Sequence, residues 1–370
     1  MGNVPLVTED ASPEFLTRAL RSTGVIDADT EVAEVEHDRI GEGVGFLGAL
    51  ARLTLRYGGP AHGAPSSVII KLPTPLPENR ALANQFGFYE REGRFYEDIG
   101  RSIAVRAPHC LFNHVDVAAD EFALILEDFG SRTMVSQIVG LEFERASEAV
   151  RAIARMHAQW WDTPAVHALG WAPTALDPEI ISAGETYRQA WPAFLATFGD
   201  DLPDGAVALG ELIASTWEST ARRTFETAPM TLCHGDFRAD NLMFDDSTDG
   251  DDHVGVLDWQ LTYRGGGIGD LAYMITQSMT PDMRRVHDRA LVEIWYDALS
   301  SALGHAPDGY SIDDAWDGYR LGTGSMTVMA VGGGGQIDPT NDRGRELFRD
   351  MATRSFSAAL ELDAATLIPA

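Results

Sequence analysis

The sequence contains very little lysine. Of the 28 basic side chains among its 370 residues, Lys71 is the single lysine and all the others are arginine. Lysine carries a compact point charge on a flexible stem, whereas arginine carries a rigid planar fork that suits bidentate partners. Composition alone therefore leaves two interpretations of Lys71 open: an incidental surface residue at a strand end, or a charge whose shape is required.

Cysteine and long apolar segments are also scarce. The two cysteines, Cys110 and Cys233, match no metal-binding or redox spacing, which favours a reducing, cytoplasmic environment. No apolar segment approaches the ~20 residues that a membrane-spanning helix requires. The opening residues MGNVPLVTED lack the basic and then apolar pattern of a secretory signal. These features predict a cytoplasmic protein that does not bind membranes.

Basic charge is scarce relative to acidic charge. The sequence has 56 Asp and Glu against 28 Lys and Arg, which gives a formal net charge of -28. Nucleic acids and anionic membranes are bound mainly by basic residues that neutralise phosphates, so both classes of partner are disfavoured. A ligand that carries phosphate would need a local basic group acting against the overall field.

The periodicity of the chain changes from strand-rich to helical. A capped helix is predicted to begin at Ser12 and to end before Gly24, and a second helix is predicted from about 79 to 99. Strands are predicted at 32–40, 51–57, 67–73 and 122–130. The later part is mostly helical, interrupted at 231–258 by two strands around a loop. The sequence therefore predicts an α+β fold whose lobes meet near Glu127–Gly130.

A glycine-rich segment follows the first predicted strand. GEGVGFLG at 41–48 contains GxGxxG at Gly43, Gly45 and Gly48. A dinucleotide-binding fold would place this motif between a strand and a helix. Here strands are predicted on both sides, as in the loop that covers the ATP phosphates in protein kinases. A plain hairpin turn is an equally good interpretation of these glycines taken alone.

The helix after Lys71 carries a carboxylate among apolar residues. Phe88, Glu92, Phe95 and Ile99 are spaced to share one helical face. Burying an unpaired carboxylate is costly, and Lys71 is the nearest basic candidate on the facing strand. The alternative is that Glu92 lies at the edge of this face and reaches solvent.

The most specific motif is HGDFRADN at 234–241, followed by LDWQ at 257–260. Asp236 and Asn241 are expected on a loop between apolar strands, and Asp258 at the end of the next strand. Oxygen ligands such as Asn241 and Asp258 suit Mg²⁺, while Asp236 could orient an acceptor hydroxyl and receive its proton. Arg238 could neutralise a transferred phosphoryl group. A polar hairpin with a capping aspartate does not explain the combined spacing.

These segments, together with GIGDLAY at 267–273, resemble the aminoglycoside phosphotransferase, choline kinase and ecdysteroid kinase-like group, whose fold is that of protein kinases. The resemblance extends from the glycine-rich segment to at least Tyr273, although Trp259 stands where phenylalanine is usual. It implies a bilobal protein-kinase-like fold, with a small, mainly antiparallel N-lobe over 1–127 and a larger helical C-lobe over 128–370.

The resemblance also implies ATP and Mg²⁺ as cofactors, a pairing of Lys71 with Glu92, and adenine binding by the backbone from Glu127 to Phe129. Together with the motifs, it gives a set of expected site residues. These are Asp236 and Arg238 for catalysis, Asn241 and Asp258 for the metal, and Gly43, Gly45, Gly48, Lys71, Glu92, Glu127 and Phe129 for the nucleotide.

Other conspicuous residues have structural interpretations. His157 shares an apolar helical face and is expected to be a buried core histidine, and His234 is expected to brace the catalytic loop. Asp270 is expected to cap its helix, to tie that helix to the loop, or to do both. The run GGGG at 332–335 is expected to form a flexible linker between terminal helices.

The sequence thus predicts an ATP-dependent kinase that transfers the γ-phosphate to a hydroxyl of a small molecule. The acidic composition and the many aromatic residues of the helical part favour a neutral or cationic alcohol with an apolar body. A nucleotide-binding regulatory protein with little turnover and a protein kinase are the alternatives. The intact Lys71, Asp236, Asn241 and Asp258 argue against the first, and the lack of a recognisable APE segment argues against the second.

Overall fold

The computed structural model describes residues 4–40, 47–247, 253–335, 337 and 340–369, which form two compact units. The N-terminal unit comprises Met1–Ile103 and Ala107–Ser131, and the C-terminal unit comprises Ala104–Arg106 and Arg132–Ala370. Residues 128–131 thus belong to the first unit, whereas the lobes predicted from the sequence divide after 127.

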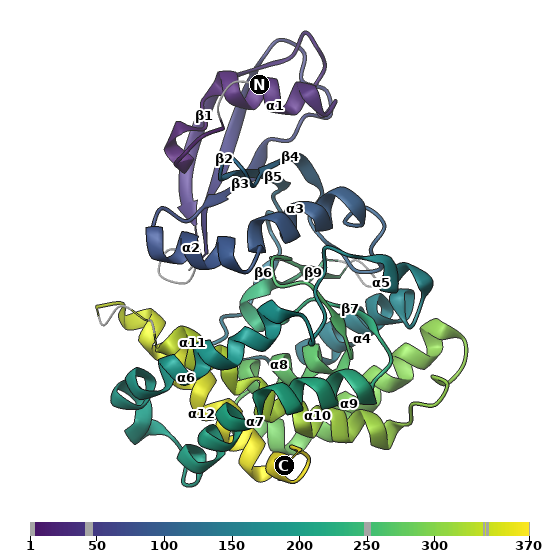
Figure 1. The fold of residues 1–370 in the computed structure, drawn as a ribbon. Coiled ribbons are helices and arrows are strands. Elements are labelled where there is room, and N and C mark those ends of the chain that lie inside the picture. Colours follow the sequence, from purple (N-terminus) through teal and green to yellow (C-terminus); the bar gives the residue numbers. More distant parts are fainter. Residues whose placement is uncertain (1–3, 41–46, 248–252, 336, 338–339, 370) are drawn as a thin grey trace. The chain divides into compact units, whose positions relative to one another are not determined.

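The N-terminal unit contains a five-stranded antiparallel sheet with the strand order β1-β2-β3-β5-β4 (Figure 1). Its strands are β1 (Glu31–Ile40), β2 (Gly48–Gly58), β3 (Ser67–Pro73), β4 (Cys110–Asp116) and β5 (Glu121–Glu127). Its helical segments are η1 (Thr8–Asp10), α1 (Pro13–Ser22), α2 (Pro77–Gln85) and α3 (Phe88–Asp98). The predicted strand-rich first part is confirmed.

The two faces of this sheet have different neighbours. Alternating apolar side chains of β2, β3 and β5 form one buried cluster with α1, which includes Leu53, Val68, Ile70, Leu72 and Ile125 together with Phe15, Leu16 and Leu20. Successive side chains of a strand point to opposite faces. Lys71, between Ile70 and Leu72, therefore points away from this cluster and toward α3.

The helix α1 begins and ends where the sequence predicts. The hydroxyl of Ser12 accepts a hydrogen bond from the Phe15 N–H at 3.2 Å, and Pro13 occupies the first helical position. Gly24, with φ of +73°, follows the helix in a left-handed conformation that glycine adopts without strain.

The single helix predicted from 79 to 99 is in fact two helices. α2 ends at Gln85 and α3 begins at Phe88, and Gly87 between them has φ of +65°. A left-handed residue cannot continue a right-handed helix, so the chain is interrupted at this glycine. The predicted apolar face is retained on α3, where Glu92 and Phe95 are buried.

The C-terminal unit is mainly helical (Figure 1). Its helices are α4 (Phe143–Trp160), α5 (Pro164–Ala168), α6 (Pro178–Phe198), α7 (Ala206–Thr227), α8 (Ile268–Ser278), α9 (Pro281–Leu303), α10 (Ile312–Ser325), α11 (Thr327–Gly334) and α12 (Asp342–Glu361). Short 3-10 segments accompany them at η2 (Gly199–Asp201), η3 (Ala239–Asn241) and η4 (Ala364–Thr366). Every residue of α8 is buried, so this helix lies in the core, with α10 and α12 packed against it.

Two small sheets complete this unit. β6 (Thr133–Met134), β8 (Leu242–Phe244) and β9 (Val254–Val256) form one, and β7 (Thr231–Cys233) pairs with β10 (Tyr263–Gly265) in the other. The prediction of two strands at 231–258 is therefore incomplete, because the described residues of this range form three short strands. β7 leads into the loop of the HGDFRADN motif, and β8 and β9 form a hairpin after it.

The prediction of a flexible linker at 332–335 is wrong. Gly332–Gly334 belong to α11, and a Cβ atom on Gly333 would lie 2.3 Å from Cε1 of Phe348 on α12. A Cβ atom on Gly335 would lie 2.8 Å from Cβ of Ala190 on α6. Gly333 and Gly335 thus allow close contact with α12 and α6, so helix packing explains these glycines better than flexibility does.

None of the described helices is both long and apolar enough to cross a lipid bilayer.

Candidate active site

The loop that carries the HGDFRADN motif joins β7 to β8 and ends in η3. Gly235 has φ of +84°, and a Cβ atom at this position would lie 2.1 Å from the carbonyl oxygen of Leu261. Both observations exclude a side chain here. Gly235 thus lets the loop pack directly against the segment that follows β9.

Asp236 is held by partners on both carboxylate oxygens. Only 8% of its side chain is exposed. Oδ1 accepts a hydrogen bond from Arg238 Nε at 3.0 Å, and Oδ2 accepts one from Asn241 Nδ2 at 2.7 Å. Tyr273 responds to the charge of this carboxylate, because burial together with the charge of Asp236 raises the pKa of Tyr273 well above its usual value. The carboxylate is therefore fixed in one orientation.

The guanidinium of Arg238 is divided among three acceptors. Besides the bond from Nε to Asp236, Nη1 donates to Gln137 Oε1 at 2.8 Å and lies 3.3 Å from Asp240 Oδ2. Burial lowers the pKa of Arg238, but the charges of Asp236 and Asp240 outweigh this effect and raise it. Arg238 is thus a permanent cation beside the predicted catalytic aspartate.

Asn241 and Asp258 meet at one end of the β8–β9 hairpin. Leu242 pairs with Val256, and the Leu257 N–H donates to the Asn241 carbonyl oxygen at 2.9 Å. Asp258 is the next residue, and its φ of +64° is uncommon for a side chain other than glycine. Such strain costs about 1–3 kcal/mol and is concentrated at functional sites.

The donor atoms at this end of the hairpin fit Mg²⁺. Asn241 uses Nδ2 to donate to the carbonyl oxygen of Asp236 at 2.8 Å as well as to its carboxylate. That orientation leaves the amide oxygen of Asn241 directed away from Asp236. An amide oxygen and the Asp258 carboxylate are hard oxygen donors of the kind that Mg²⁺ prefers.

The carboxylate of Asp270 anchors the backbone of the loop. It accepts the N–H groups of His234 at 2.8 Å and Gly235 at 2.9 Å, and it bonds to Nε2 of His157 at 3.1 Å. α8 has no side-chain cap at its N-terminus. Of the two roles predicted for Asp270, the structure therefore shows the tie to the loop and not the cap.

Both histidines have the structural roles expected of them. His157 is fully buried, and its Nδ1 accepts a hydrogen bond from Trp295 Nε1 at 3.0 Å. Its ligand atom lies within 4.8 Å of those of Cys233 and Asp270. Since both ring nitrogens of His157 already have partners, we interpret this group as structural rather than as a metal site. His234 bonds through Nε2 to the Leu257 carbonyl oxygen at 2.9 Å, which braces the loop.

In the N-terminal unit, Lys71 forms the predicted ion pair with Glu92. Nζ lies 2.7 Å from Oε2, and the two side chains are 5% and 1% exposed. A Cβ atom on Gly48 would lie 3.1 Å from Cε of Lys71, so this glycine provides space for the lysine stem. Gly43 and Gly45 lie outside the described residues. The contacts proposed between these residues and a nucleotide stay a prediction.

The segment from Glu127 to Phe129 is held by Asp128, which the motif analysis does not single out. Its carboxylate accepts hydrogen bonds from Arg52 Nε at 2.8 Å, Ser67 Oγ at 2.8 Å and the Gly130 N–H at 3.0 Å. Burial raises the pKa of Asp128, but these bonds outweigh burial and hold the pKa below its ordinary value. A fixed backbone at this point suits the adenine-binding role predicted for the segment.

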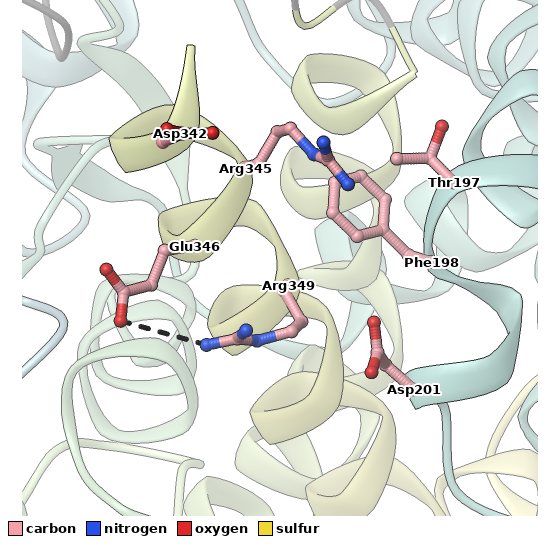
Figure 2. A pocket seen from close by; sticks show the side chains of 7 residues that line it. All are labelled: Thr197, Phe198, Asp201, Asp342, Arg345, Glu346 and Arg349. Atoms are coloured by element: carbon pink, nitrogen blue, oxygen red, sulfur yellow. Dashed lines mark ion pairs between the residues drawn. The ribbon is translucent and has the colours of Figure 1, made fainter. Parts of the chain in front are cut away.

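A separate pocket of about 280 Å³ lies where α6 and η2 meet α12 (Figure 2). Its lining residues are Thr197, Phe198, Asp201, Asp342, Arg345, Glu346 and Arg349. Charges of both signs face it, and Glu346 pairs with Arg349 at 3.8 Å. None of the predicted site residues lines this pocket, so we do not include it in the candidate site.

Gln137, Trp295 and Tyr273 are further residues that sequence reasoning missed. Tyr273 lies three positions after Asp270 on α8, and that helical spacing could have placed it beside the loop. Gln137 and Trp295 have no local signal, because each reaches its partner from a distant part of the chain.

Comparison with known proteins gives a match to one family model over part of the chain, and a fold. The model of the ecdysteroid kinase-like family matches residues 174–307, a range that contains Asp236, Asn241, Asp258 and Asp270. A search of curated protein sequences found no match.

Several solved structures are similar over nearly the whole chain. Choline kinase from Cryptosporidium parvum Iowa II has a TM-score of 0.61 and 10% identity, over 97% of this chain and 98% of that one. A protein of Ralstonia eutropha JMP134 assigned as an aminoglycoside phosphotransferase has a TM-score of 0.55 and 16% identity, over 95% and 98%. A GDP complex of a mutant aminoglycoside 2'-phosphotransferase has a TM-score of 0.51 and 11% identity, over 96% and 98%.

At these identities the likeness to solved structures establishes the fold. The bilobal, protein-kinase-like α+β fold is thereby confirmed. Together with the family match, it confirms the resemblance of this chain to the aminoglycoside phosphotransferase, choline kinase and ecdysteroid kinase-like group.

Proposed function

We propose that the protein is an ATP- and Mg²⁺-dependent kinase that phosphorylates a hydroxyl group of a small molecule. The observation that supports this most strongly is the convergence of three residues: Asn241 donates to the Asp236 carboxylate, and Asp258 directly follows Leu257, whose N–H donates to the Asn241 carbonyl oxygen. The structural relatives are described as a choline kinase and aminoglycoside phosphotransferases, one of them with GDP, which supports a nucleotide-dependent phosphotransferase.

In the proposed reaction, the acceptor hydroxyl oxygen bonds to the γ-phosphorus while the bond from that phosphorus to the bridging oxygen of ADP breaks. The Asp236 carboxylate, oriented by Arg238 and Asn241, would position the hydroxyl and accept its proton. The Arg238 cation would stabilise negative charge on the transferred group. A bound Mg²⁺, held by Asn241 and Asp258, would neutralise charge on the phosphates.

The N-terminal unit would supply the nucleotide contacts. The ion pair with Glu92 fixes the position of Lys71 Nζ, as a group that binds phosphate oxygens requires. Gly43, Gly45 and Gly48 would form the phosphate-covering loop, and the backbone of Glu127–Phe129 would receive the adenine.

The acceptor is proposed to be a neutral or cationic alcohol with an apolar body, because the net charge of -28 disfavours the approach of anions. Cys110 and Cys233 are both free thiols, which is consistent with the reducing, cytoplasmic environment proposed for the enzyme.

Two substitutions test the division of roles. Asp236→Asn should lower kcat for ADP release by about 100-fold or more while the Kd for ATP with Mg²⁺ changes less than about threefold, since other groups hold the nucleotide. Asp258→Ala should instead weaken Mg²⁺-dependent ATP binding itself. Asp282→Asn, a change at a side chain that is 95% exposed, is the matched control and should leave both quantities unchanged.

Equal ATP binding by the Asp236 and Asp258 variants would contradict this division. Wild-type protein that binds ATP but releases no ADP with any acceptor would indicate the regulatory alternative. Turnover that depends on added polypeptide would indicate a protein kinase.

A further inference from the structure

Gln137 contacts the candidate site from the segment between β6 and α4. It is 1% exposed, and its side-chain oxygen Oε1 accepts a hydrogen bond from Arg238 Nη1 at 2.8 Å. The same guanidinium bonds through Nε to Asp236. The buried, neutral amide of Gln137 is thus linked through Arg238 to the carboxylate of Asp236, which we propose as the catalytic base.

The orientation of this amide is fixed by its other contacts. Nε2 of Gln137 donates to the carbonyl oxygen of Gln277 at 3.3 Å, and its backbone N–H donates to Asp240 Oδ1 at 2.8 Å. A flipped amide would place two donors against each other at Arg238 and two carbonyl oxygens against each other at Gln277. Only the present orientation satisfies all of these groups.

The backbone around Gln137 is held in turn by a buried cation from the C-terminal helix. Arg354 of α12 donates through Nη1 to the carbonyl oxygen of Gln137 at 2.7 Å and through Nη2 to that of Ile138 at 2.7 Å. Its side chain is only 8% exposed, and its carboxylate partner, Asp350, lies 3.7 Å away. Burial lowers the pKa of Arg354, so this contact has a desolvation cost. The two hydrogen bonds to carbonyl oxygens offset part of this cost, and they fix the segment at 137–138.

We propose that Gln137 is a positioning residue of the phosphoryl-transfer site, which acts through Arg238 on Asp236. This inference rests on the proposed function. Without the amide oxygen, Nη1 of Arg238 would retain only Asp240 at 3.3 Å, and the guanidinium would be drawn away from its present orientation. A misplacement of about 1 Å in a site of this kind can lower the rate by about 100-fold.

Gln137→Met tests the proposal, because it removes the acceptor but keeps the length and burial of the side chain. It should lower kcat by about 10- to 100-fold while the KM for ATP changes less than about twofold. Gln277→Met is the matched control. Gln277 is also fully buried, and its side-chain amide donates to the Met326 carbonyl oxygen. The substitution changes only this side chain and keeps the backbone carbonyl oxygen that accepts from Gln137. Gln277→Met should lower thermal stability about as much as Gln137→Met does, and it should leave kcat within about twofold of wild type.

Gln137→Glu separates positioning from packing. It keeps an oxygen acceptor for Arg238 but loses the Nε2 donor and adds a buried charge, so a purely structural role predicts more damage than from Gln137→Met. The positioning role instead predicts a higher kcat for Gln137→Glu than for Gln137→Met. Equal kcat losses in Gln137→Met and Gln277→Met, or wild-type kcat in Gln137→Met, would overturn the proposal.

A readout without substrate keeps the proposal distinct from the kinase assignment. Exchange of the Arg238 Nε–H with solvent can be followed by NMR in arginine-labelled protein, with Arg238→Lys used to assign the signal. Gln137→Met should accelerate this exchange at least about tenfold, and Gln277→Met should not. Unchanged exchange in Gln137→Met would refute the inference even if the protein is a kinase, whereas faster exchange in a protein without kinase activity would refute only the proposed function.

Discussion

At the scale of single residues, the conformation of Asp258 depends on its neighbours more than on its own preference. Its φ of +64° is disfavoured for aspartate. The flanking residues are fixed on both sides, by the bond between His234 Nε2 and the Leu257 carbonyl oxygen at 2.9 Å and by the bond from Trp259 Nε1 to the Val256 carbonyl oxygen at 3.2 Å. These contacts hold the backbone of Asp258 in a strained conformation at the point where we propose that the metal binds.

Lys71 gives the sharpest prediction at this scale. Lys71→Arg keeps the charge, but the planar guanidinium cannot reproduce the 2.7 Å contact of Nζ with Glu92 in a space that Gly48 already limits. We expect kcat/KM for ATP to fall by roughly 100-fold, equivalent to about 2.7 kcal/mol, with the fold intact. Steady-state ADP release and circular dichroism measure the two quantities.

A control for this substitution lies on the adjacent strand. Arg56→Lys exchanges the same two side chains at a position that is 67% exposed and should leave kcat/KM unchanged. Because Lys71 is the single lysine, its labelling by an amine reagent can be followed directly, and ATP with Mg²⁺ should protect it. Full activity of Lys71→Arg, or equal labelling with and without nucleotide, would rule out a phosphate-binding role.

At the scale of elements, the glycine-rich helix α11 allows a paired test of packing against flexibility. A Cβ atom on Gly333 would lie 2.3 Å from Phe348, whereas one on Gly332 would meet no atom within 4 Å. Gly332→Ala should therefore stabilise the protein by about 0.5–1 kcal/mol, because alanine favours a helix interior. Gly333→Ala should destabilise it by about 1–3 kcal/mol through overpacking.

Denaturant unfolding of both variants measures these free energies. The two substitutions are chemically identical and adjacent, so any difference reflects the contact with Phe348. A flexible linker would predict a small effect of the same sign at both positions.

At the scale of the whole molecule, the net charge of -28 bears on the choice of acceptor. Its field should attract cations and repel anions, and salt should screen both effects. We expect ADP release across a panel of alcohols to favour aminoglycosides, choline analogues, macrolides or steroid alcohols over hydroxy acids and sugar phosphates. Raising the ionic strength from about 0.05 to 0.5 M should increase the KM of a cationic acceptor. A clear preference for an anionic acceptor would refute the charge argument and leave the kinase proposal standing.

Features that local chemistry encodes could be predicted from the sequence. Alternation along the strands and the cap at Ser12 predicted the central strands and α1 of the N-terminal unit, and the spacing from Asp236 to Asn241 with the later Asp258 indicated the candidate catalytic segment. The apolar face that carries Glu92 predicted a buried partner, and Lys71 provides it. These features were predictable because periodicity and spacing act over a few residues.

Features that depend on contacts between distant segments became visible only in the folded chain. The glycines at 332–335 suggested a linker, but the close approach of Gly333 to Phe348 and of Gly335 to Ala190 shows that helix packing requires glycine at these two positions. Gln137 and Trp295 carry no recognisable motif, yet they complete the hydrogen bonds of Arg238 and His157. A buried polar group must find a partner wherever the fold places one, and no local pattern records which distant residue this will be.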